Sequence, residues 1–163
     1  MKRSQINQAI MHTKGLLEKN NIKLPPFGYW SLEEWKSDKR NVTTIKEVML
    51  GWDITDYGNG IFDEFGAVLF TLRNGSLTDS RVGTPYAEKL IVLKDGQRLP
   101  THYHASKTED IINRAGEVAS INDDNTDNYN AEDVSRFSKI EEDEPILHPL
   151  CNEYIKVLGE QNV

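Results

Sequence analysis

The chain has 163 residues, with 26 Asp and Glu against 19 Lys and Arg, so its formal net charge is −7. This length predicts one domain with a core large enough to fold without disulfides. The acidic balance argues against a nucleic-acid partner, which usually requires a basic surface. The one cysteine, Cys151, allows no internal disulfide. No apolar run has the length of a membrane span and no secretory signal is visible, so we expect a cytoplasmic protein without a membrane partner.

Residues 1–42 predict an N-terminal helical arm. Ser4 is a suitable N-cap for a helix whose apolar residues Ile6, Ile10 and Leu17 recur at helical spacing. The sequence LPPFG at 24–28 interrupts it, and the sequence SLEE at 31–34 is a capping box that predicts a short second helix.

Residues 43–121 predict a β domain. Runs rich in Val, Ile, Leu and Phe alternate with glycine turns, and they place strands at 48–54, 67–73, 87–94, 99–104, 110–113 and 117–121. The turn sequences YGNG at 57–60, NG at 74–75 and DG at 95–96 favour hairpins. An antiparallel barrel or sandwich is therefore expected, rather than alternating strands and helices.

Residues 122–163 predict an acidic C-terminal segment packed on the barrel. Nine acidic and two basic residues lie between 122 and 144, and one short helix is expected within 150–158. Such a run is typical of a solvated surface, and it lacks the glycine of a calcium loop. Asp124 and Asp127 could bind sugar hydroxyls, but we interpret them as loop residues.

A pair of histidines is the first indication of a functional site. His102 and His104 stand two apart in a strand-like run, so both imidazoles are expected on one face, close enough to share a metal ion. The residues between His104 and Glu109 leave room for a turn, so Glu109 could add a carboxylate to the same metal ion. Two histidines and one carboxylate suit a divalent first-row metal. The other histidines, His12 and His148, are expected to be ordinary surface or helix residues.

The spacing around these residues resembles the first motif of the cupin superfamily, with Gly96, His102, His104, Glu109 and Gly116 in register. Longer stretches are similar to the D-lyxose isomerase family of cupins. They are MKRS at 1–4, LPPF at 24–27, LGWDIT at 50–55, LFTLRNG at 69–75, YAEK at 86–89, EDIINR at 109–114, DEP at 143–145 and LCNEY at 150–154. The resemblance implies a mainly β fold, a cupin-type jelly-roll barrel that carries the helical arm.

The resemblance also implies an activity and its residues. Members of that family interconvert D-lyxose and D-xylulose, and often D-mannose and D-fructose, with Mn²⁺, although other divalent metals are possible. By this match, His102, His104 and Glu109 are metal ligands, Glu117 moves a proton between C1 and C2, and Lys89 reaches the substrate. These residue types suit the chemistry, since isomerisation requires a base beside a polarised carbonyl and stabilisation of negative charge on oxygen. Family members are usually homodimers, which predicts a homodimer here.

One block of the family pattern is missing. The second cupin motif, with the histidine that is the fourth metal ligand, is absent, and Gly116 runs directly into Glu117. We therefore expect an incomplete barrel, with open strand edges that a second subunit could complete. Three hypotheses remain open from the sequence: a metal-dependent sugar isomerase, a non-catalytic cupin remnant that binds metal or sugar, and a facial-triad iron oxygenase.

Overall fold

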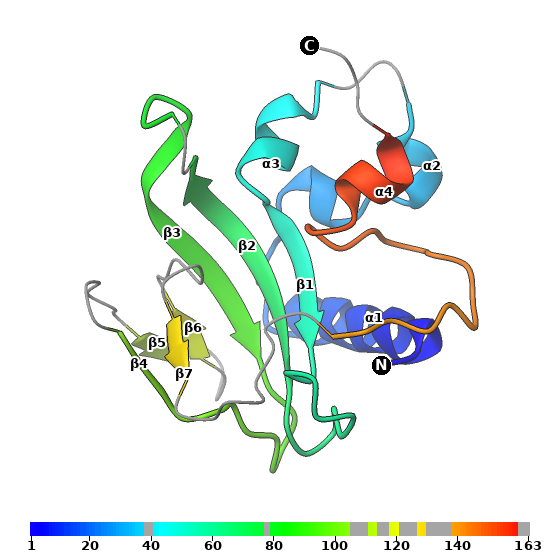
Figure 1. Cartoon of the computed structure of the whole chain (residues 1–163), viewed down its shortest axis with the longest axis vertical. Helices are drawn as coiled ribbons and strands as arrows, with labels where there is room; N and C mark the ends of the chain where they lie inside the picture. Colours follow the sequence, from blue (N-terminus) through cyan, green and yellow to red (C-terminus); the bar gives the residue numbers. More distant parts are fainter. Residues whose placement is uncertain are drawn as a thin grey trace.

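The computed structural model describes residues 1–37, 41–76, 79–104, 111–113, 118–120, 127–129 and 138–159. Figure 1 shows its elements in chain order. They are α1 (Arg3–Lys19), η1 (Pro26–Gly28), α2 (Leu32–Trp35), α3 (Thr43–Glu47), β1 (Gly51–Thr55), β2 (Ala67–Gly75), β3 (Gly83–Val92), β4 (His102–His104), β5 (Ile111–Asn113), β6 (Val118–Ser120), β7 (Asp127–Tyr129) and α4 (Tyr154–Leu158).

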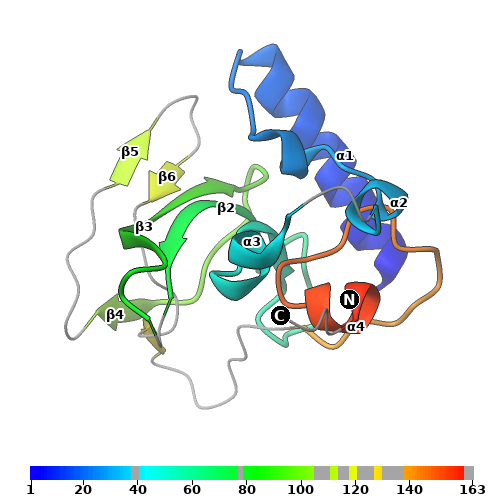
Figure 2. The ribbon, with the colours of Figure 1, turned by 90° about the horizontal axis from the view of Figure 1, so that it is seen from above.

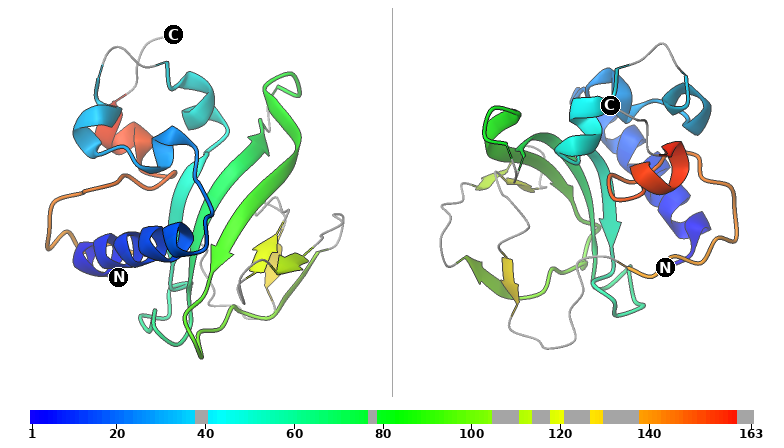
Figure 3. Two further views of the ribbon diagram at one scale, coloured as in Figure 1. Left: turned by 180° about the vertical axis from the view of Figure 1, so that it is seen from behind. Right: turned by 45° about the horizontal axis from the view of Figure 1, so that its top comes forward.

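The described strands form two antiparallel sheets. The larger sheet has the order β1-β2-β3-β6-β5, and the smaller one pairs β4 with β7. The helix α1 lies on one side of the larger sheet, and the β4–β7 pair lies on the other (Figures 1 and 3). Figure 2 shows the same separation from above. The mainly β fold with a helical arm is thus confirmed, and over the described residues the strands form an unclosed cupin-type barrel.

The hydrophobic core fills the space between α1 and the larger sheet. Helical spacing brings Ile6 and Ile10 onto the sheet, and both are fully buried. Alternate residues of the three long strands face them, namely Trp52, Ile54, Val68, Phe70, Leu90 and Val92. The convex face of the sheet therefore provides the main stability of the domain.

An aromatic cluster attaches the short helices to this core. Phe27 stacks on Phe70 at 5.5 Å between ring centroids, and Trp35 packs on Tyr154 at 4.7 Å. The indole of Trp52 donates a hydrogen bond to the Gly28 carbonyl at 2.9 Å. The helical arm and the C-terminal helix α4 are therefore fixed to β1 and β2.

The acidic residues 142–144 dock on the first turn of α1. Asp143 accepts hydrogen bonds from the backbone and the hydroxyl of Ser4, at 2.9 and 2.7 Å, and these lower the pKa of Asp143. Glu144 accepts one from the Asn7 amide at 3.1 Å. Ser4 lies inside the helix, which begins at Arg3, so the predicted cap at Ser4 is wrong. A distant carboxylate satisfies this helix end instead, where the helix dipole favours negative charge.

Arg3 links the two ends of the described chain. Its guanidinium is completely buried and forms paired hydrogen bonds with both Glu142 and Glu153. Glu153 also accepts a hydrogen bond from the Leu150 backbone at 3.0 Å. Cys151, which follows Leu150, donates its backbone N–H to the Trp52 carbonyl at 2.7 Å and so covers the edge of β1. One ionic cluster thus holds α1, the C-terminal segment and the first strand together.

The predicted strands are found with shifted ends. The prediction at 48–54 corresponds to β1, but α3, which was not predicted, precedes it. Turns form at 57–60 and 95–96, with positive φ angles at Tyr57, Gly58, Gly60 and Gly96. The predicted hairpin at 95–96 is wrong, because β3 and β4 on either side of it lie in different sheets. The NG sequence at 74–75 is not a turn, because β2 continues through Gly75 and a longer connection follows. The strand β7 lies in the segment expected to be loop, where it pairs with β4.

The capping box at 31–34 is confirmed. The Ser31 hydroxyl accepts from the Glu34 backbone at 3.3 Å, and the Glu34 carboxylate accepts from the Ser31 backbone at 2.9 Å. Among the described residues, no helix is long and apolar enough to cross a membrane. The segment boundaries 1–42, 43–121 and 122–163 stay predictions.

Replacing Arg3 by Met should destabilise the fold by roughly 3–5 kcal/mol, because it leaves the buried Glu153 carboxylate without its countercharge. Urea unfolding followed by circular dichroism measures this. Arg81→Met is the matched control, since Arg81 is 87 % exposed and pairs with Asp79 on a loop; its change should stay within about 0.5 kcal/mol. Equal losses in both variants would contradict the role given to Arg3.

Acid should destabilise the protein partly through Glu142. Hydrogen bonds from Arg3 lower the pKa of Glu142 from its ordinary 4.5 to about 2. Because the folded pKa is the lower one, this stabilisation is present above about pH 4.5 and is lost as the pH falls toward 2. Solvent screening reduces it, since the carboxylate is 38 % exposed. The unfolding free energy of Glu142→Gln, measured against pH, should fall less steeply in this range than that of the wild type.

Replacement by alanine should change the stability of the protein in opposite directions at two glycines. Gly51 has a φ of +111°, and an added Cβ would collide with the Tyr154 hydroxyl, so Gly51→Ala should cost roughly 1–3 kcal/mol. Gly15 lies in α1 with open space around it, so Gly15→Ala should stabilise by about 0.4–1 kcal/mol. Thermal unfolding of the two variants tests the pair, and a stable Gly51→Ala protein would disprove the strain.

Candidate functional site

The concave face of the larger sheet differs in composition from the convex face. Strand alternation turns the residues between the core positions toward the β4–β7 side. They are Asp53, Thr55, Ala67, Leu69, Thr71, Lys89 and Ile91. Apart from Leu69 and Ile91, these residues are small or polar, whereas the convex set is large and apolar. A sheet that only needed to pack on both sides would be expected to carry apolar residues on both faces. The concave face is therefore the candidate site.

Lys89, which the family resemblance predicts to reach the substrate, lies on this face. It is 3 % exposed, in the middle of β3. Its neighbours across the sheet are Thr71 on β2 and Ser120 on β6. A buried ammonium is costly unless polar groups surround it. Its position on the face turned to the barrel interior suits a positive charge held for an anionic oxygen.

A second ionisable residue on the same face was missed by the sequence reasoning. Asp53 is 2 % exposed at the centre of β1, directly opposite Leu69 on β2. The signal was available in the sequence WDI at 52–54, where one acidic residue interrupts a strand that is otherwise buried. Asp53 and Lys89 thus place opposite charges on one buried surface.

The histidine strand faces this surface from the smaller sheet. His102 and His104 begin and end β4, where they pair with Tyr129 and Asp127. His102 is partly buried, and its Nδ1 lies 3.0 Å from the Pro100 carbonyl. That contact requires the proton on Nδ1 and leaves the lone pair on Nε2, which is the form that binds metals.

The full ligand set extends beyond the described structure. The side chain of His104 and all of Glu109 and Glu117 lie outside the described residues. Over the residues that are described, no group of three His, Cys, Asp or Glu side chains converges. The contact with Pro100 gives His102 a tautomer suited to metal binding, and the three-ligand set stays a prediction.

His148 has a structural role. Its Nδ1 lies 2.7 Å from the Trp30 carbonyl, and its Nε2 lies 2.8 Å from the Lys14 ammonium. Burial lowers the pKa of His148, and the charge of Lys14 acts in the same direction. The imidazole is therefore neutral, with the proton on Nδ1, and connects α1 to the C-terminal segment.

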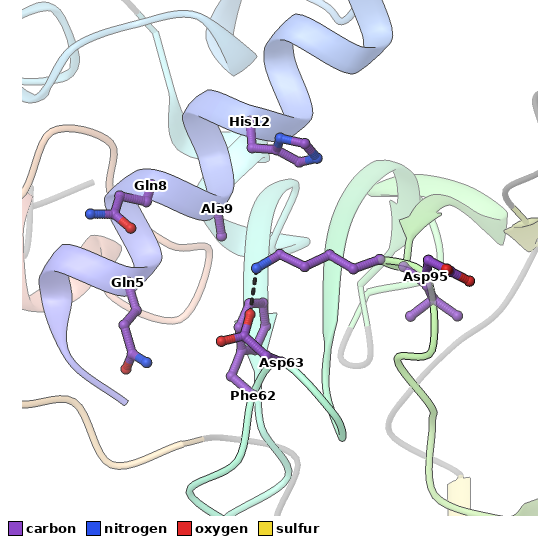
Figure 4. A pocket seen from close by; sticks show the side chains of 9 residues that line it. Gln5, Gln8, Ala9, His12, Phe62, Asp63 and Asp95 are labelled. Atoms are coloured by element: carbon purple, nitrogen blue, oxygen red, sulfur yellow. Dashed lines mark hydrogen bonds and ion pairs between the residues drawn. The ribbon is translucent and has the colours of Figure 1, made fainter.

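A pocket of about 640 Å³ lies outside the barrel, beside α1 (Figure 4). Gln5, Gln8 and His12 line it from the helix. Lys94 also lines it and forms an ion pair with Asp63. None of the predicted site residues lines this pocket, so it is separate from the concave face.

These features define a class: a cupin-type β protein with an open barrel, a polar concave face and a histidine-bearing strand opposite that face. Within that class, the chain belongs to the D-lyxose isomerase family, whose model matches residues 1–117 and 115–154.

Two relatives support this assignment. The chain is 30 % identical over 223 residues to the D-lyxose/D-mannose isomerase of Escherichia coli O157:H7, covering 94 % of this chain and 98 % of the relative. It is 29 % identical over 228 residues to the D-lyxose/D-mannose isomerase of Serratia proteamaculans, covering 98 % and 100 %.

The same comparisons support the missing block. The family match is divided into two parts that meet at residues 115–117, where the sequence predicts the junction. The Escherichia coli alignment spans 223 residues and the chain has 163, so at least 60 aligned positions have no residue here. The chain thus retains both flanks of the family fold and lacks an internal segment.

Proposed function

We propose that this chain is a metal-dependent aldose–ketose isomerase that interconverts D-lyxose and D-xylulose, and D-mannose and D-fructose. The two relatives named for D-lyxose and D-mannose support the substrates. The observation that carries the proposal is the buried Lys89 on a polar concave face opposite the histidine strand. An interior surface of this kind is suited to a small polar ligand.

Different residues of the chain carry out different parts of the proposed reaction. Glu117 removes the proton from the carbon beside the carbonyl and returns it to the neighbouring carbon, so the reaction passes through an enediolate. Lys89 provides a fixed positive charge for the oxygen that becomes negative in this step. Its burial strengthens the interaction, because water does not screen it.

His102, His104 and Glu109 are the proposed ligands of a divalent cation, Mn²⁺ by family resemblance. When bound, such a cation supplies Lewis acidity at the carbonyl and hydroxyl oxygens. Two nitrogen donors and one carboxylate are a chemically suitable set, and the Pro100 carbonyl orients the first of them.

A homodimer is part of the proposal. Among the described strands, β5 pairs only with β6 and so leaves an edge to which a second copy could add a strand. Light scattering at enzyme concentrations should give twice the chain mass of 18.6 kDa. A monomeric mass would remove this part of the proposal.

The alternative is a non-catalytic remnant that binds metal or sugar. It is favoured by the at least 60 aligned positions that this chain lacks, since the resemblance places the fourth ligand there. The purified protein should convert D-lyxose to D-xylulose with added Mn²⁺, and a chelator should abolish the conversion. No conversion, with the fold intact, would favour the remnant.

Lys89→Met should lower kcat by roughly 10²–10³, because the side chain keeps its volume and loses its charge. Lys94→Met is the matched control: this lysine lies outside the barrel, 44 % exposed, and its loss should leave kcat within about twofold. Steady-state kinetics on D-lyxose measure both. Equal effects, or an unchanged Lys89→Met enzyme, would exclude the role of Lys89.

A further inference from the structure

Lys14 is a nucleophilic side chain that the proposed mechanism does not use. It lies on α1, where its Nζ is 2.8 Å from Nε2 of His148 and 5.6 Å from the centre of the Tyr29 ring. Lys14 and His148 are both half-buried, so the amine is enclosed on the protein side and still accessible from solvent. The contact between them places a nucleophile directly beside a base.

The tautomer of His148 directs a lone pair at Lys14. Nδ1 of His148 lies 2.7 Å from the Trp30 carbonyl, and because a carbonyl oxygen can only accept, Nδ1 carries the ring proton. Nε2 therefore accepts the hydrogen bond from Lys14. Burial lowers the pKa of His148, and the charge of Lys14 adds to this effect, so Nε2 stays unprotonated at neutral pH. His148 thus has the form that a general base requires.

The surroundings of Lys14 favour its neutral, nucleophilic form. Burial lowers the pKa of Lys14, and the opposing effect of the Glu34 charge is smaller. Lys156, by contrast, donates to the Glu142 carboxylate at 2.8 Å, and a carboxylate partner keeps the proton on a lysine. A lysine that is desolvated and adjacent to a base is the kind that forms Schiff bases with carbonyl compounds.

We propose that Lys14 is a site of covalent modification by reducing sugars, with His148 as the general base. Nζ adds to the aldehyde carbon of the open-chain sugar and forms a C–N bond. The two N–H protons pass through Nε2 of His148 to the former carbonyl oxygen, which leaves as water, and a C=N bond remains. The imine then rearranges to a stable ketoamine: one proton moves from C2 to C1 and another from the C2 hydroxyl to the nitrogen. No oxidant or reductant is consumed.

This site is independent of the candidate active site. The helix α1 lies on one side of the larger sheet, and the histidine strand β4 lies on the other (Figures 1 and 3). The modification requires only the sugar carbonyl and the two side chains, and it involves neither metal nor turnover. The proposed isomerase activity can therefore fail while the modification occurs, and the reverse also holds.

The test measures how fast each lysine of the folded protein reacts with the aldopentose D-ribose. Cyanoborohydride reduces the imine and fixes the sugar on the lysine, a chelator suppresses metal-dependent turnover, and peptide mass spectrometry gives initial labelling rates. Lys14 should react at least about tenfold faster than Lys19, because a positioned general base contributes roughly 10²–10⁴. Lys19 is exposed in the last turn of the same helix and is the internal reference. A Lys14 rate equal to or below that of Lys19 would overturn the proposal.

His148→Gln separates proton transfer from a structural contribution. A glutamine amide can donate to the Trp30 carbonyl and accept from Lys14, but it cannot relay a proton as imidazole does. Labelling of Lys14 in this variant should fall to within about threefold of the Lys19 rate, with the circular dichroism spectrum unchanged. If the variant keeps the wild-type preference for Lys14, the role of His148 is excluded.

His12→Gln is the matched control, since His12 is exposed on the same helix. It should leave the labelling rates of Lys14 and Lys19 unchanged, and an equal loss in both histidine variants would contradict a specific role for His148. If His148→Gln does not fold, the comparison of Lys14 with Lys19 in the wild type still decides whether Lys14 is the reactive site.

Discussion

The buried guanidinium of Arg3 is the interaction on which the arrangement of this protein depends. It binds two carboxylates, Glu142 and Glu153, that are distant in sequence, so it forms only when α1 and the C-terminal segment are both in place. A fully buried arginine with one partner missing is strongly unfavourable. The ionic cluster therefore selects one way of docking the helical arm, while the apolar contacts supply most of the stability.

The two faces of the larger sheet have different roles: the convex face stabilises the fold, and the concave face carries the candidate site. Its convex face is sealed by α1 and the aromatic cluster, so the polar residues of the concave face do not have to contribute to the core. A strand turns alternate side chains to opposite faces, which allows Trp52 and Ile54 to pack while Asp53 between them meets the barrel interior. A one-residue slip in register would exchange the two sets, and for this reason the same apolar pattern fixes the position of the charges.

The junction at residues 115–117 changes how this site is built. The internal segment absent from the chain removes part of the family fold, yet the histidine strand retains a partner, because β7 comes from the acidic segment after the junction. Lys89 and Asp53 lie before the junction, on strands anchored by the core. The part of the concave face that carries Lys89 and Asp53 therefore does not depend on the lost segment, whereas the proposed metal-binding set does.

The sequence by itself determined most of the element types, two of the three turns, the N-terminal helical arm and the family, because these depend on local periodicity, capping residues and spaced motifs. Lys89 and His102 could be chosen from the sequence for the same reason: a motif fixes them. Asp53 could not, since an acidic residue in a strand becomes informative only when its neighbours show which face is the core. Likewise, the sequence predicts a solvated acidic surface at 142–144, and only the tertiary structure shows that these residues contact the first turn of α1. The tertiary structure decided what depends on contacts between distant residues: the Arg3 cluster, the pairing of β7 with β4, and the grouping of opposite charges on one buried face.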